Sequence, residues 1–95
     1  MAAFLVAAVQ TSADAVSYDY TIRVYNQTGQ HWQYCSVIVN DGATADFANV
    51  SNGSYVEVNY YEVMNYVSVV YTTSSGYTIT RDNLPITNGS LVYVR

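Results

Sequence analysis

Residues 16–24, VSYDYTIRV, show the alternation of apolar and polar side chains on which the fold prediction rests. Apolar or aromatic side chains occupy every even position from Val16 to Val24, and polar ones occupy every odd position. Successive side chains of a strand point to opposite faces, so this alternation predicts a half-buried β-strand. The turn-forming residues 26–30 are predicted to end it.

The next stretch, residues 31–40, is predicted to be a central strand. Its two faces are both apolar, with Trp32, Tyr34 and Ile38 on one side and Cys35, Val37 and Val39 on the other. A strand that is apolar on both faces is expected in the interior of a sheet. Asp41-Gly42 after it is a strong turn signal.

Further short strands are predicted at residues 43–48, 55–61, 63–73, 77–81 and 90–95, with turns at 50–54, 74–76 and 82–85. No segment has a helical period, and the 95 residues contain a single proline. This length suits one domain and is too short for two. The fold predicted is all-β: one seven-stranded, mainly antiparallel, Greek-key-like sandwich over residues 16–95.

Residues 1–15 differ from the rest, with an unbroken apolar run from Ala2 to Val9 followed by Ala13-Asp14-Ala15. One interpretation is the remnant of a secretion signal, cleaved before Val16. A second is an assembly strand donated to a neighbouring subunit, as in pili, and a third is a segment of this domain's own core. The apolar side chains of the assembly strand would be Phe4, Leu5, Val6 and Val9. The run is too short to cross a membrane as a helix.

The stretch 47–58, FANVSNGSYVEV, resembles a hairpin of transthyretin-like and collagen-adhesin B-type sandwiches through Phe47, Val50, Gly53 and Tyr55. The resemblance implies a secreted or cell-surface structural module of prealbumin-like type. Such adhesin repeats often carry a lysine–asparagine crosslink. This chain has no lysine, so that crosslink is excluded.

The composition argues against a protein that binds nucleic acid. The chain has three arginines, no lysine and seven acidic residues, for a formal net charge of -4. It cannot build the basic surface that nucleic acid requires.

Catalytic and cofactor sites are not predicted either. Cys35 is the single cysteine, so no disulfide forms within the chain, and it lies about 13 Å along the strand from His31, too far for proton transfer. The sequence therefore predicts a protein that is not an enzyme, with no metal or cofactor site.

Two kinds of surface residue suggest binding. Four N-x-[S/T] motifs in predicted turns are candidate glycosylation sites, at Asn26, Asn49, Asn52 and Asn88. Eleven tyrosines offer large rigid faces for sugars or proteins, and the candidates by parity or aromatic character are Tyr25, Trp32, Tyr55 and Tyr61.

The function predicted is an extracellular structural subunit that self-assembles into a filament, coat or surface layer, so the expected partners are further copies of the chain and glycans. The alternative is a secreted module that binds sugars or a protein surface through exposed tyrosines.

Overall fold

The computed structural model describes residues 20–40, 42–87 and 90–95. Within these ranges the chain forms seven strands and no helix. The strands are β1 (Tyr20–Asn26), β2 (Trp32–Val39), β3 (Ala43–Val50), β4 (Tyr55–Tyr60), β5 (Tyr66–Thr73), β6 (Thr78–Pro85) and β7 (Leu91–Val94). The predictions of an all-β fold and of seven strands are confirmed.

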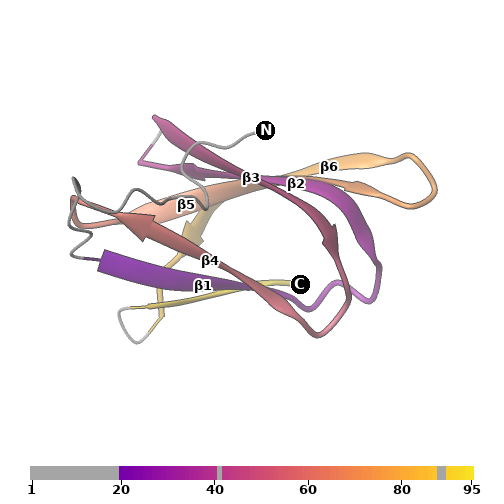
Figure 1. Cartoon of the computed structure of the whole chain (residues 1–95), viewed down its shortest axis with the longest axis horizontal. Coiled ribbons are helices and arrows are strands. Elements are labelled where there is room, and N and C mark those ends of the chain that lie inside the picture. Colours follow the sequence, from indigo (N-terminus) through magenta and orange to yellow (C-terminus); the bar gives the residue numbers. More distant parts are fainter. Residues whose placement is uncertain (1–19, 41, 88–89) are drawn as a thin grey trace, which may run out of the picture.

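The strands form two sheets, which Figure 1 shows as two layers. The smaller sheet has the order β4-β1-β7, with β1 antiparallel to β4 and parallel to β7. The larger has the order β3-β2-β5-β6 and is antiparallel throughout. β2 is thus an interior strand, as its two apolar faces predicted.

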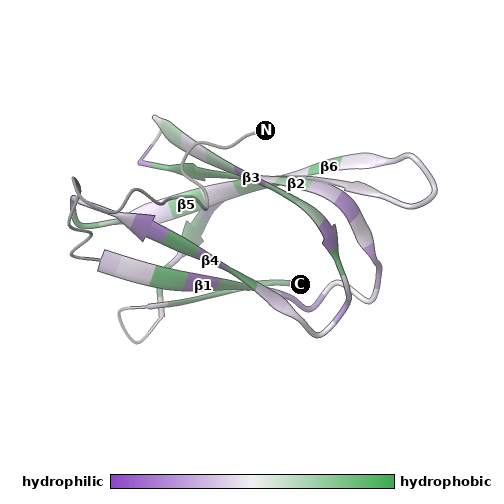
Figure 2. Ribbon diagram, in the orientation of Figure 1, coloured by the Kyte–Doolittle hydropathy of each residue, from purple (hydrophilic) through white to green (hydrophobic). Residues whose placement is uncertain are grey.

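The core lies between the two sheets. Even-numbered residues of β1, β4 and β7 point inward, and Figure 2 shows the resulting hydrophobic bands along β1 and β4. The larger sheet supplies the opposite wall. The buried residues are Ile22, Val24, Trp32, Cys35, Val37, Val39, Ala45, Val50, Val58, Met64, Val67, Val69, Tyr71, Val92 and Val94.

Two local predictions are wrong. Residues 82–85 belong to β6 instead of forming a turn, because an irregularity at Asn83, with φ of 54°, lets the strand continue. Pro85 is tolerated because β6 is an edge strand, where a missing backbone N–H is harmless. The stretch 47–58 is not a hairpin within one sheet, since β3 and β4 lie in different sheets.

The start of β2 contains a β-bulge that changes which residues face the core. The pairing of β2 with β5 shifts by one residue between Trp32 and Tyr34. Trp32 and its β3 partner Val50 are both buried, whereas Tyr34 and its partner Ala48 are exposed. On β3 the change of face coincides with Asn49, whose φ is 57°. A strict period of two could not have predicted this switch.

Candidate binding face on the three-stranded sheet

The outer face of the smaller sheet gathers tyrosines and arginines from three strands. In β1, β4 and β7 the even-numbered side chains point into the core, so the odd-numbered side chains point to the outer face. Tyr25 therefore lies between Tyr55 of β4 and Tyr93 of β7. We define the tyrosine face as Arg23, Tyr25, Tyr55, Glu57, Tyr93 and Arg95.

The three tyrosines form a cross-strand stack. The ring centroids of Tyr25 and Tyr55 are 5.1 Å apart with planes at 46°, and those of Tyr25 and Tyr93 are 5.5 Å apart at 28°. Offset aromatic pairs at such distances stabilise each other beyond the area they bury. The stack therefore holds three large side chains in fixed positions on a solvent-facing sheet.

An arginine contacts the ring at each end of the stack. The Arg23 Cζ lies 4.7 Å from the centroid of the Tyr55 ring, and the Arg95 Cζ lies 5.0 Å from that of Tyr93. These are cation–π distances. The rings contact one another and the guanidinium groups through their faces. A partner would therefore meet mainly ring edges and hydroxyl groups, and not one flat aromatic surface.

Polar contacts hold the arginines in place. Arg23 Nε lies 3.5 Å from Glu57 Oε2, with both side chains 47% exposed, and Arg95 Nε donates a hydrogen bond to Gln27 Oε1 at 3.1 Å. A hydrogen bond with Tyr25, followed by the nearby Tyr55, raises the pKa of Arg23. Such an exposed ion pair adds little stability, so its main effect is to orient the guanidinium.

The structure brings together two of the four predicted ligand residues, Tyr25 and Tyr55. Tyr61 lies elsewhere, beyond the end of β4, where its ring is 4.6 Å from that of Tyr60. The hydrogen bond with Tyr61 is the largest cause that raises the pKa of Tyr60. Tyr93 and both arginines were missed. Tyr93 and Arg95 come beside Tyr25 only through the parallel pairing of β7 with β1, whereas Arg23 lies two residues before Tyr25 on the same face of β1, where alternation could have found it.

The burial of Trp32 contradicts the prediction that it stacks on a ligand at the surface. Trp32 is 0% exposed, its ring lies 4.7 Å from that of Tyr71, and its Nε1 donates to Thr28 Oγ1 at 3.2 Å. The bulge at the start of β2 turns it inward.

The candidate glycosylation sites differ sharply in access. Asn26 is 0% exposed, and its Nδ2 donates to the carbonyl oxygens of Gln30 and Val50 at 2.8 and 3.0 Å. The atom that would carry a glycan is thus committed inside the fold, which excludes Asn26. Asn49 and Asn52 are exposed. Asn88 lies outside the described residues, as do the predicted assembly residues Phe4, Leu5, Val6 and Val9.

The described part of the chain holds no activated nucleophile at its cysteine. Cys35 is buried, and burial, with a smaller contribution from Asp46, raises its pKa from 9.0 to about 12. The thiolate needed for nucleophilic attack is therefore strongly disfavoured. Within the same residues no group of three or more His, Cys, Asp or Glu side chains is placed to hold a metal ion. Nor does any described segment form a helix suited to spanning a lipid bilayer.

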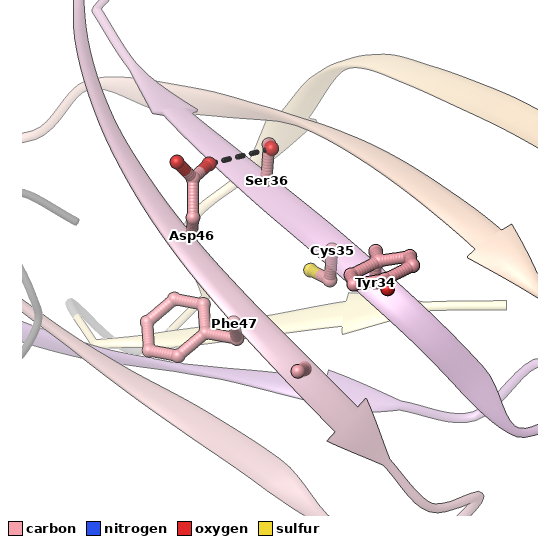
Figure 3. A pocket seen from close by; sticks show the side chains of 6 residues that line it. Tyr34, Cys35, Ser36, Asp46 and Phe47 are labelled. Carbon is pink, nitrogen blue, oxygen red and sulfur yellow. Dashed lines mark hydrogen bonds between the residues drawn. The ribbon is translucent and has the colours of Figure 1, made fainter. Parts of the chain in front are cut away.

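A second surface feature is a pocket of about 460 Å³ on β2 and β3. Figure 3 shows its lining, with the hydrogen bond from Ser36 Oγ to Asp46 Oδ1 at 2.6 Å. The lining residues are Tyr34, Cys35, Ser36, Asp46, Phe47 and Ala48.

No family model and no curated protein matches the chain. Its structure is similar to the NMR structure of a protein from Eubacterium rectale, with a TM-score of 0.66 and 19% sequence identity. The match covers 90% of this chain and 85% of that one. At this identity the similarity concerns the fold alone.

Proposed function

We propose that the protein is an extracellular structural subunit that self-assembles, and that the tyrosine face forms one half of the contact between successive subunits. The observation that carries the proposal is the stack of Tyr55, Tyr25 and Tyr93 with an arginine at each end. Tyrosine and arginine are the residues enriched where protein interfaces derive most of their affinity.

The rigidity of the face favours binding. A side chain immobilised on association costs about 0.5–1.5 kcal/mol of conformational entropy. Here the three rings already restrain one another, and Glu57 and Gln27 restrain the arginines before any partner arrives. The face is preorganised, so little of that cost remains.

Charge distribution favours contact between unlike surfaces of two copies. The tyrosine face carries two arginines and one glutamate, a formal charge of +1, which leaves one arginine and six acidic residues, a charge of -5, for the rest of the chain. A positive face therefore meets the more acidic remainder of another copy more favourably than another positive face. A head-to-tail contact of this kind does not close on itself and builds a filament or layer.

Several finer features belong to the same proposal. Greek-key sandwich connectivity is supported by the passage from one sheet to the other at β3–β4 and at β6–β7. What remains in support of a prealbumin-like relationship is the packing of Phe47 and Val50 against the core and Gly53, with φ of 89°, in the turn that joins the two sheets. The proposal also includes secretion of the protein and glycosylation at Asn49 or Asn52. Peptide mapping of protein from a glycosylating host tests the glycosylation.

Sedimentation velocity of the full chain over a range of concentrations tests the assembly. We expect concentration-dependent association that Tyr25→Ala weakens, because Tyr25 is the ring shared by both stacked pairs. Tyr77→Ala is the matched control, since Tyr77 is 71% exposed on the other sheet's β5–β6 turn. A chain that stays monomeric throughout, or equal effects of the two variants, would contradict the proposal.

The alternative, a secreted module for sugars or a protein surface, is favoured by tyrosines outside the stack. Tyr34 and Tyr61 are 60% and 55% exposed. A monomeric chain that binds immobilised glycans, with binding lost on substitution of these residues and not of Tyr25, would support it over self-assembly.

A further inference from the structure

We propose that the pocket on β2 and β3 binds a small organic cation with a primary ammonium group on an apolar body. The site lies on the larger sheet, whereas the tyrosine face lies on the smaller one, so this inference does not depend on self-assembly.

The register of β2 and β3 creates the hollow. Tyr34 lies opposite Ala48, and Ser36 lies opposite Asp46. By strand alternation these four side chains share the outer face, whereas Cys35 and Phe47 between them point toward the core. Directly opposed residues are about 5 Å apart, so the small Ala48 leaves open the space beside the Tyr34 ring. The volume, about 460 Å³, is in the range of small-molecule sites.

Asp46 supplies a fixed negative charge at one side of the hollow. Its side chain is half-buried, and its Oδ1 accepts the hydrogen bond from Ser36 at 2.6 Å. No cationic side chain in the described ranges forms an ion pair with it. Arg23 and Arg95 belong to the tyrosine face, and Arg81 is on β6, with β5 lying between that strand and β2. A partly desolvated carboxylate without a cationic partner attracts a cation and repels an anion.

Tyr34 supplies the aromatic wall. It is 60% exposed and takes part in none of the ring pairs or cation–π contacts of the described residues. An ammonium over a tyrosine ring is attracted by the negative face of the ring. The ammonium group would donate to Asp46 beside the face of the Tyr34 ring, and the apolar body would cover Ala48.

The composition of the chain favours a small molecule, and not a second copy of the protein, as the source of the primary ammonium group. The sequence contains no lysine, so no side chain of a second subunit offers a primary ammonium.

Backbone amide NMR of the full chain, titrated with 2-phenylethylammonium chloride, tests the site. We expect saturable shift changes centred on residues 34–36 and 46–48. Asp46→Asn should weaken binding by at least about tenfold, because it removes a charge-assisted hydrogen bond. Asp82→Asn, on β6, is the matched control and should leave binding unchanged.

Three results would overturn the proposal: no saturable shifts, equal binding of neutral 2-phenylethanol, or undiminished binding by Asp46→Asn. If Asp46→Asn fails to fold, Tyr34→Leu at an exposed position serves instead. It should weaken binding several-fold, and unchanged binding by that variant would equally contradict the site.

Discussion

At the level of single residues, Asn26 joins the end of β1 to two loops and to β3. Its Oδ1 accepts hydrogen bonds from the backbone N–H and the hydroxyl of Thr28, at 3.1 and 2.7 Å. Its Nδ2 donates to Gln30 and Val50, and its backbone carbonyl accepts from Gly53 N–H at 2.7 Å. A buried amide can be tolerated here because every one of its polar atoms has a partner.

Replacing Asn26 with alanine should therefore be strongly destabilising. Asn26→Ala leaves several backbone groups unpaired near the core, and each buried orphan costs about 1–3 kcal/mol. We expect the free energy of unfolding, measured by chemical denaturation, to fall by about 2–4 kcal/mol. Asn59→Ala, which removes one exposed hydrogen bond with Thr21, is the control and should change it by under about 1 kcal/mol. Equal losses would show that Asn26 does not hold the loops together.

Cys35 should be inert in the folded protein. Burial raises its pKa to about 12, so the folded thiol stays protonated while an unfolded one ionises above its ordinary pKa of 9.0. Because the folded state then holds a proton that the unfolded state releases, the free energy of unfolding is highest below pH 9 and falls as the pH rises toward 12. A disulfide reagent at about pH 8 should leave native protein unmodified and label it fully in denaturant. Fast labelling of native protein would contradict the buried position.

At the level of strands, the bulge at the start of β2 and the left-handed Asn49 near the end of β3 form one bend, and this bend marks where prediction from local sequence stops. Alternation predicted β1, the interior position of β2 and an outward-facing Tyr25, because each follows from local periodicity. It failed at Trp32, since the bulge reverses the face, and at Tyr93, since its neighbours depend on long-range pairing. The burial of Asn26 could not be predicted either, because an asparagine at the end of a strand reads as an exposed turn residue.

The bend itself can be tested at Asn49, whose φ of 57° is unfavourable for a β-branched residue. Asn49→Val should lower the free energy of unfolding by about 1–2 kcal/mol, because valine pays a steric penalty in this conformation. Asn49→Gly, which also removes the side chain that contacts His31, should stay within about 0.5 kcal/mol of the parent protein. Thermal or chemical denaturation of unglycosylated protein measures both. Similar losses for the two variants would place the effect in the side chain instead of the backbone.

At the level of the whole molecule, the two outer faces have opposite character. The smaller sheet presents the tyrosine face with its net positive charge, and the larger sheet presents Asp46 beside an open hollow and otherwise mostly small polar or apolar residues. An acidic protein with one positive face has a charge asymmetry that favours the approach of copies in a single relative orientation.

This asymmetry makes a prediction about salt. If the positive tyrosine face meets the more acidic remainder of the next copy, screening should weaken the attraction, because the Debye length falls from about 10 Å at 0.1 M salt to about 3 Å at 1 M. We expect the sedimentation coefficient at fixed concentration to decrease over that range, and Arg95→Gln to weaken association at low salt while reducing the salt dependence. Contacts driven by the apolar N-terminal residues alone would instead strengthen or stay constant as salt rises, because salts that are excluded from protein surfaces favour apolar burial. The sign of the salt effect therefore separates assembly through the tyrosine face from assembly through Phe4, Leu5, Val6 and Val9.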